Sequence, residues 1–243
     1  MTKLNFGNFL PLSTVDWYGR AVCVVFFRGC PIRCSYCHNF TLFKSKQLIG
    51  VDVVEDRISH ALKFISGVVF TGGEPCAQPE ALKSLCEFAK NLDLATGLET
   101  NGFYPDVLSL LVENNIVDRV FLDVKAPLSD PASYGRIIEG NGVDTSLRVK
   151  KSLEIADGIV EVRSTLFRSF ADRDFVLRIA KDISSINSVF VLNQGDPDHA
   201  WREKIRLEKP FSRDEMMELA QVALDFVDDV RIRTREKGEE KMS

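Results

Sequence analysis

The stretch "AVCVVFFRGCPIRCSYCHNF" at residues 21–40 joins two features that decide the fold of this chain. Its first seven residues form an apolar run of strand length, which predicts a β-strand. The strand is followed at once by a loop that holds three of the six cysteines, Cys30, Cys34 and Cys37. The first question is therefore which chemistry needs three thiols at the end of a strand.

Short apolar runs of the same kind recur along the chain, and longer helical patterns alternate with them. The expected strands are 21–27, 67–72, 94–100, 119–125, 159–167 and 188–194, with 230–234 as an edge, and the expected helices are 52–65, 78–91, 106–115, 143–157, 172–184 and 212–228. Strict alternation implies parallel strands joined by right-handed crossovers. We therefore expect an α/β fold, a partial (β/α)6 barrel with outer helices.

The domain organisation follows from the same pattern. We expect one domain over residues 1–235, because six such units fill this length without a linker or an internal repeat. Residues 236–243 are charged and poor in apolar side chains, so we expect them to form a solvated, mobile tail. Ser212 and Glu215 have the spacing of a capping box at the start of the last helix.

Composition excludes several classes of function. The 243 residues are 45% hydrophobic, and 31 basic against 35 acidic residues give a net charge of -4. This charge supplies no basic field for nucleic acid or anionic lipid. No apolar stretch reaches membrane-spanning length, and residues 1–20 contain no apolar run with a cleavage site, so we expect a cytoplasmic protein. Thiols stay reduced in that compartment, which favours a metal or redox use of the cysteines.

Charged and polar side chains follow the other expected strands. They lie in "TGGEP" (71–75), "ETNG" (99–102), "LDVK" (122–125) and "EVR" (161–163). In parallel α/β sheets the loops after the strands build the active site. The period-two alternation of a strand also places three pairs on one face each, namely Glu99 with Asn101, Asp123 with Lys125, and Glu161 with Arg163. We expect these residues to surround a polar ligand.

The three clustered cysteines allow three interpretations. A structural zinc ion needs a fourth ligand, and here this would be His38, next to Cys37, or a distant thiol. The cysteines could also be thiols without a metal. A cubane iron–sulfur cluster on three thiolates would leave one iron open to another ligand.

The cysteine loop and the loop after the next expected strand resemble motifs of the radical S-adenosylmethionine (SAM) superfamily. The spacing C-x3-C-x2-C, with Tyr36 before the last cysteine, is similar to its signature, and "GGEP" at 72–75 is similar to its second motif. The resemblance implies one 4Fe-4S cluster on Cys30, Cys34 and Cys37, whose open iron binds SAM. It also implies that the reduced cluster cleaves SAM to a 5′-deoxyadenosyl radical, which abstracts hydrogen from a substrate.

The resemblance implies a set of SAM contacts as well. Gly72 and Gly73 would let the backbone approach the methionine amino group, and Glu74 would fix that turn. Glu99 and Asn101 would contact the ribose or amino group, as in activating enzymes of glycyl-radical proteins. Lys125, with Asp123, would face the carboxylate of SAM, and Arg163 would add a basic contact. The cofactor-binding residues implied in this way are Tyr36, Gly72, Gly73, Glu74, Glu99, Asn101, Asp123, Lys125 and Arg163.

Within the superfamily, five segments in order resemble the longer, largely archaeal activating proteins of anaerobic ribonucleoside-triphosphate reductase. They are "PLSTVDWYG", "GCPIRCSYCHN", "FTGGEP", "ETNG" and "LDVKAP". This implies a glycine Cα of a partner reductase as the substrate, converted to a glycyl radical. The chain departs from the pattern at Cys76, directly after "GGEP". No second cysteine set exists, so the electron would come from an external flavodoxin or ferredoxin type donor.

Two other functions stay open at this stage. One is a radical SAM enzyme that acts on a small molecule or nucleotide, similar to 7-carboxy-7-deazaguanine synthase. The other, from a different class, is a noncatalytic metal-binding protein. We assign no role to Cys76, Asp196 or His199.

Overall fold

The structure is a computed structural model that describes residues 2–43 and 46–243. The chain forms two compact units. The first unit consists of Met1–Pro31 and Asn39–Phe121, and the second of Ile32–His38 and Leu122–Ser243. The boundary between them falls in the cysteine loop and inside one strand, β6 (Arg119–Asp123). The expectation of a single domain over 1–235 stays a prediction.

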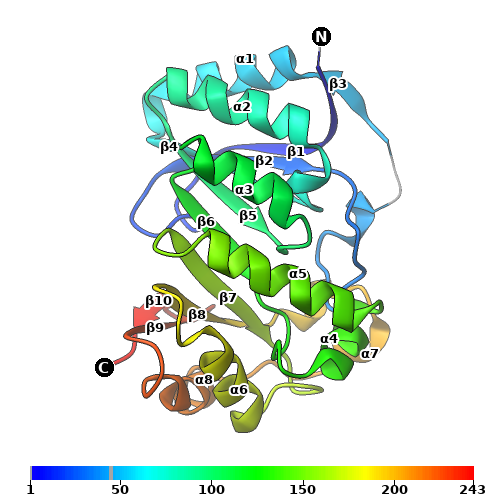
Figure 1. Cartoon of the computed structure of the whole chain (residues 1–243), viewed down its shortest axis with the longest axis vertical. Helices are drawn as coiled ribbons and strands as arrows, with labels where there is room; N and C mark the ends of the chain where they lie inside the picture. Colours follow the sequence, from blue (N-terminus) through cyan, green and yellow to red (C-terminus); the bar gives the residue numbers. More distant parts are fainter. Residues whose placement is uncertain (1, 44–45) are drawn as a thin grey trace. The chain divides into compact units, whose positions relative to one another are not determined.

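The first unit is a mostly parallel sheet with helices packed against it. Its strands are β1 (Lys3–Ser13), β2 (Val22–Phe27), β3 (Leu48–Gly50), β4 (Gly67–Gly72), β5 (Ala95–Thr100) and the start of β6, in the order β3-β1-β2-β4-β5-β6. Its helices are α1 (Val51–Ala61), α2 (Pro79–Asn91) and α3 (Pro105–Glu113), with short 3-10 turns η1 (Phe40–Leu42), η2 (Leu62–Phe64) and η3 (Pro75–Ala77). The strands β2, β4 and β5 are parallel, whereas β1 is antiparallel to β2 and β3. Helices α1 and α2 lie side by side against these strands (Figure 1).

The core of the first unit begins at β2. Five of its six residues are buried, because β2 lies between β1 and β4 and is covered by α1. Val22 and Val24 pack with Val69 of β4 and with Phe121, and Trp17 closes this cluster at its edge. Burying each such apolar side chain contributes about 1.5–3 kcal/mol. The apolar run at 21–27 therefore has both neighbours that a buried strand needs.

The second unit repeats the parallel arrangement with other helices. Its strands are the end of β6, β7 (Val160–Leu166), β8 (Val189–Gln194), β9 (Asp229–Thr234) and β10 (Gly238–Lys241), in the order β6-β7-β8-β9-β10. Its helices are α4 (Pro131–Ile138), α5 (Gly142–Ile155), α6 (Arg173–Ile183), α7 (Glu203–Arg206) and α8 (Arg213–Ala220), with 3-10 turns η4 (Pro197–His199) and η5 (Gln221–Ala223). The strands β7, β8 and β9 are parallel. Helices α4 and α5 are neighbours, and α8 contacts α6, β8 and β9 (Figure 1).

The expected α/β fold with parallel strands and outer helices is confirmed. All six expected core strands are present, and the strand expected at 230–234 is present as β9, but it is not an edge because β10 pairs with its outer side. The capping box at α8 is also present, with Glu215 N donating to Ser212 Oγ (3.3 Å) and Ser212 N donating to Glu215 Oε2 (2.7 Å). The sequence analysis did not identify β1, β3, α4 or α7.

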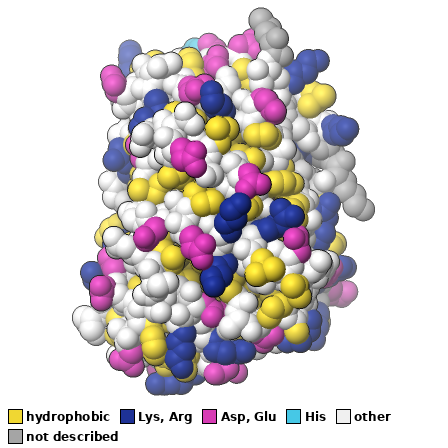
Figure 2. All heavy atoms as spheres, viewed as in Figure 1, with side chains coloured by type: hydrophobic (Ala, Val, Ile, Leu, Met, Phe, Trp, Pro, Cys, Tyr) yellow, Lys and Arg dark blue, Asp and Glu magenta, His cyan; other side chains and the backbone are white. Residues whose placement is uncertain are grey.

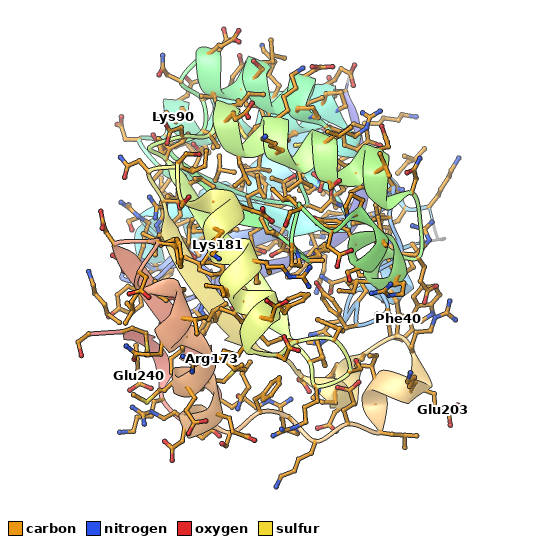
Figure 3. The ribbon with its side chains drawn as sticks, turned by 60° about the horizontal axis from the view of Figure 1, so that its bottom comes forward. Phe40, Lys90, Arg173, Lys181, Glu203 and Glu240 are labelled. Carbon is orange, nitrogen blue, oxygen red and sulfur yellow. The ribbon has the colours of Figure 1, made fainter. Side chains whose placement is uncertain are left out.

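The expectation of a mobile tail at 236–243 is wrong. Residues Gly238–Lys241 form β10, which pairs antiparallel with β9. Glu239 on this strand is buried between Arg231 and Arg233, with N···O distances of 2.9 and 2.5 Å. Glu240, labelled in Figure 3, accepts two hydrogen bonds of 2.8 Å from Arg213 of α8. The two glutamates of this strand are therefore paired with arginines of the fold, which is why a sequence poor in apolar residues is ordered.

The surface agrees with the balanced composition. Acidic and basic side chains are interspersed on the face shown in Figure 2. Among the described residues, no helix is both long enough and apolar enough to cross a bilayer.

Candidate active site

Two glycine-containing loops of the first unit are in direct contact. The loop after β2 contains Gly29 (φ 89°), and the loop after β4 contains Gly72 (φ 117°), both in the left-handed region that favours glycine. Gly73 N donates to the Phe27 carbonyl and Glu74 N donates to the Gly29 carbonyl, each at 2.8 Å. A Cβ on Gly73 would overlap the Gly29 carbonyl. The glycines of both motifs are therefore needed for this close backbone approach.

Glu74 anchors the second of these loops from inside the first unit. Its carboxylate is fully buried and accepts hydrogen bonds from Cys76 N (3.0 Å), the Thr100 hydroxyl (2.8 Å) and Asn101 N (2.8 Å). Burial raises the pKa of Glu74, and these three donors limit the rise. The side chain thus ties the loop after β4 to the end of β5.

The end of β5 carries both residues expected there. Glu99 accepts a hydrogen bond of 2.6 Å from Thr71 Oγ1 on β4. Asn101 is buried, and its Nδ2 lies 3.5 Å from Cys30 Sγ. Three residues predicted at separate points of the sequence, Cys30, Glu74 and Asn101, are thus brought together in the first unit.

The second unit holds the other two clustered cysteines beside an aromatic stack. Tyr36 is buried, stacks on Phe167 with ring centroids 5.1 Å apart, and contacts Phe170 at 5.8 Å. The backbone N of Cys37 donates to the Cys34 carbonyl at 3.0 Å, which closes the turn between the two thiols. The aromatic residue before the last cysteine therefore fixes this turn in the unit.

Lys125 lies beside that turn. Its Nζ is 2.9 Å from Asp123 Oδ2 and 5.7 Å from the centre of the Tyr36 ring. Burial lowers the pKa of Lys125, but Asp123, Cys34 and Tyr36 together raise it well above its usual value. Burial raises the pKa of Cys34 to about 11, although the lysine charge opposes the rise. A protonated, buried ammonium next to a thiol stabilises negative charge at this point.

Arg163 is held by a carboxylate on its own strand. Its Nε lies 2.7 Å from Glu161 Oε1, and both side chains are buried on β7. Arg233 of β9 lies 3.6 Å from the same Glu161 oxygen. The expected pairing of Glu161 with Arg163 on one face of the strand is present. A contact of Arg163 to SAM stays a prediction.

Two of the three histidines, His38 and His199, have partners in the second unit. His38 Nε2 lies 3.0 Å from the Asp196 carbonyl, and His199 Nδ1 lies 2.8 Å from Asp196 Oδ2. Asp196 also pairs with Arg235. The loop after β8 therefore contacts the residue that follows Cys37.

Two of the three expected cluster ligands have a polar neighbour within their own unit. Cys30 faces an amide donor in the first unit, and Cys34 lies near an ammonium in the second; each of these neighbours favours the thiolate, but burial outweighs the ammonium and keeps the pKa of Cys34 raised. Among the described residues, none of the six cysteines forms a disulfide. The same residues include no group of three Cys, His, Asp or Glu side chains that could hold a metal ion. Cys30 belongs to one unit and Cys34 and Cys37 to the other, so the ligand set stays a prediction.

Several neighbours of the site were missed by the sequence analysis. They are Thr71, Thr100, Phe167 and Phe170. The two threonines stand within the quoted motifs, directly before a glycine or an asparagine, and this position was the available signal. No sequence signal pairs Tyr36 with Phe167, because the two are 131 positions apart.

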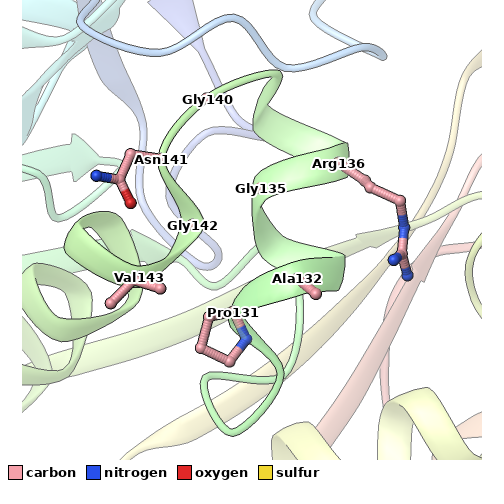
Figure 4. Close-up of a pocket in the computed structure, with 8 residues that line it drawn as sticks. All are labelled: Pro131, Ala132, Gly135, Arg136, Gly140, Asn141, Gly142 and Val143. Atoms are coloured by element: carbon pink, nitrogen blue, oxygen red, sulfur yellow. The ribbon is translucent and has the colours of Figure 1, made fainter.

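A separate pocket of about 650 Å³ lies between α4 and α5 (Figure 4). Its lining is Pro131, Ala132, Gly135, Arg136, Gly140, Asn141, Gly142 and Val143. Only Arg136 among these residues is charged, and none is a nucleophile or a common metal ligand. The pocket therefore does not gather catalytic groups.

Comparisons with known proteins show which family this chain is similar to. Residues 24–181 match the model of the family described as the radical SAM superfamily. A Methanocaldococcus jannaschii protein named as a glycyl-radical enzyme activating enzyme is 28% identical over 96% of this chain and 97% of its own length. The pyruvate formate-lyase-activating enzyme of Clostridium pasteurianum is 29% identical over 68% of this chain and 71% of its own length.

Solved structures show the same fold at low identity. TYW1 with a lysine-pyruvate adduct bound has a TM-score of 0.65 at 19% identity, over 92% of this chain and 80% of that one. Streptococcus suis SuiB bound to the precursor peptide SuiA also has a TM-score of 0.65, at 13% identity over 84% of this chain and 45% of that one. At these identities the likeness concerns the fold alone.

Proposed function

Because the chain belongs to the radical SAM superfamily, we propose that it is a glycyl-radical enzyme activating enzyme whose protein substrate is an anaerobic ribonucleoside-triphosphate reductase. The cofactors of this superfamily, and of this chain, are a 4Fe-4S cluster and SAM. The observation that carries the activase proposal is the match to the M. jannaschii protein, which spans nearly the whole of both chains. The match to a pyruvate formate-lyase-activating enzyme supports the same reaction class.

The proposed cluster ligands are Cys30, Cys34 and Cys37. They lie within eight positions of one loop, so the chain itself keeps them close. When bound, the cluster and SAM supply a 5′-deoxyadenosyl radical able to abstract a hydrogen atom from a glycine Cα. The proposed SAM contacts remain Tyr36, Gly72, Gly73, Glu74, Glu99, Asn101, Asp123, Lys125 and Arg163.

The described contacts support distinct tasks for these residues. Lys125 keeps its proton because its pKa is raised, so it offers a permanent cation to the carboxylate of SAM. The backbone of Gly72 and Gly73 can approach a ligand closely because neither carries a Cβ. The Glu74 carboxylate oxygens are occupied inside the first unit, so its side chain supports the loop that it belongs to.

An external electron donor follows from the remaining cysteines. Cys23, Cys76 and Cys86 are each at most 1% exposed. They are scattered along the sequence and form no second cysteine motif for an auxiliary cluster. We therefore propose one cluster per chain, reduced by a low-potential donor of the flavodoxin or ferredoxin type.

The test is formation of a glycyl radical on the reductase. The anaerobically reconstituted and reduced chain is mixed with SAM and the reductase of the same organism, and electron paramagnetic resonance (EPR) spectra are recorded. We expect a doublet glycyl-radical signal, with slow SAM cleavage when the reductase is absent, because no hydrogen donor is then positioned.

Three variants serve as controls for the cluster. Cys30→Ala, Cys34→Ala and Cys37→Ala should each lose iron loading and the signal, whereas Cys86→Ala should retain both.

Rapid SAM cleavage with a purine precursor, and no signal with the reductase, would favour a small-molecule enzyme instead. A colourless protein after reconstitution would point to a noncatalytic metal-binding protein.

A further inference from the structure

We propose that Asn101 is a positioning residue for the cluster: its side-chain amide donates a hydrogen bond to the Cys30 sulfur and raises the reduction potential of the iron that Cys30 binds. This inference deepens the proposed function, since it rests on Cys30 as a cluster ligand. It assigns Asn101 a role in addition to the expected contact to the ribose or amino group of SAM.

The hydrogen bond has suitable length and partners. Asn101 Nδ2 lies 3.5 Å from Cys30 Sγ, within the range for an N–H donor and the large sulfur atom. A thiol sulfur is a weak acceptor, but a ligating thiolate carries negative charge and accepts more strongly. Both residues belong to the first unit, so the contact is defined inside one compact part of the chain.

The neighbouring contacts determine which end of the amide faces the sulfur. Phe103 N donates to Asn101 Oδ1 at 3.0 Å, an interaction that only the oxygen of the amide can accept. A flipped amide would place its NH2 group against the Phe103 N–H. The oxygen is therefore engaged with the backbone, and the NH2 group points to Cys30.

Backbone contacts and burial also hold Asn101 in its position. The backbone N of Asn101 donates to the buried Glu74 carboxylate at 2.8 Å, and Asn101 itself is 6% exposed. Gly102, next in the chain, takes φ 72° and permits the tight turn to Phe103. Water competes poorly for a donor held in such a place, which strengthens the bond to sulfur.

The direction of the effect follows from charge. Reduction adds an electron to the cluster, and part of the added negative charge lies on its sulfur ligands. A hydrogen-bond donor stabilises the more negative state, so hydrogen bonds to the sulfurs are among the factors that set the potential. Removal of the donor should make the cluster harder to reduce.

The experiment measures the potential of the reconstituted full chain without SAM and without the reductase. Two variants keep an oxygen acceptor for Phe103 N and weaken or remove the donor to sulfur. The hydroxyl of Asn101→Ser is neutral and one bond shorter than the amide, so its proton lies farther from the sulfur, whereas Asn101→Asp has no donor and carries a charge. At a fixed solution potential we expect the ratio of reduced to oxidised cluster in Asn101→Ser to fall about tenfold, or 59 mV for a one-electron couple. Asn101→Asp should fall further, because its carboxylate repels the added electron.

The iron content of each variant and a control substitution elsewhere in the chain show whether a changed potential comes from the bond between Asn101 and Cys30. Asn114→Asp makes the same chemical change at the exposed end of α3, where the amide bonds the Leu110 carbonyl, and should leave the potential unchanged. An unchanged potential in Asn101→Ser at full iron content would overturn the proposal. Weaker SAM binding with an unchanged potential would also overturn it and leave Asn101 as a SAM contact alone. Retained iron in Cys30→Ala would remove the premise, and none of these results depends on the activase reaction.

Discussion

At the residue scale, Glu74 is the clearest case of a buried polar group with a structural task. Its carboxylate satisfies three buried donors, those of Cys76, Thr100 and Asn101. A buried donor left without an acceptor costs about 1–3 kcal/mol. We expect Glu74→Ala to lower the free energy of unfolding of the metal-free chain by about 3 kcal/mol, measured by urea denaturation. Glu74→Gln should cost less, because glutamine keeps one acceptor oxygen.

The matched control for this change is Glu80→Ala. Glu80 is exposed in the first turn of α2, so its removal should change the free energy of unfolding by about 0.5 kcal/mol through the helix dipole alone. Equal effects of the two alanine variants would mean that the hydrogen bonds of Glu74 contribute nothing net to stability.

At the element scale, β10 depends on the pairing of Glu239 with two arginines. Burial raises the pKa of Glu239, but Arg233 and Arg231 outweigh this and lower it below its ordinary value of 4.5. A carboxyl with a lowered pKa adds stability that is fully present above the unfolded-state pKa and is lost as the pH falls through the folded-state pKa. We expect Glu239→Gln to cost about 1–3 kcal/mol at pH 7.

The pH dependence distinguishes this pairing from a packing effect. The difference in free energy of unfolding between the wild type and Glu239→Gln should shrink as the pH falls below about 4.5. Glu218→Gln, on the exposed side of α8, should show no difference at either pH. A constant difference across the pH range would assign the role of Glu239 to packing.

At the scale of the whole molecule, SAM binding should stabilise the folded chain. At a SAM concentration 100 times the Kd, the reconstituted wild type gains about 2.7 kcal/mol. Loss of the charged contact in Lys125→Ala should weaken binding by about 1.5–3 kcal/mol. The gain at the same SAM concentration then falls to about 0.3–1.3 kcal/mol. The measurement is the shift of Tm with SAM under anaerobic conditions.

The control for that experiment is Lys63→Ala. Lys63 is exposed in η2, and its loss should leave the SAM-dependent shift of Tm intact. An undiminished shift in Lys125→Ala, with full iron content, would show that Lys125 serves the fold of the second unit rather than the cofactor.

The sequence alone determined the helices and strands that depend on residues close together in the chain. The apolar run at 21–27 and its five successors have the length and composition of buried strands, and Ser212 with Glu215 determines the start of α8. The order of the motifs along the chain, and the spacing of Cys30, Cys34 and Cys37, also stand in the sequence itself. These features identified the α/β class and the superfamily.

Only the tertiary structure decided the features that depend on partners distant in the chain. Within the segment 236–243, Gly238–Lys241 form a strand, and Arg213, Arg231 and Arg233 pair with its two glutamates; no local pattern encodes that pairing. Glu74 turns inward because Thr100 and Asn101 offer their donors from another strand. The orientation of the Asn101 amide toward Cys30 likewise follows from contacts with Glu74 and Phe103, because a hydrogen bond depends on distance and direction, which a sequence pattern does not contain.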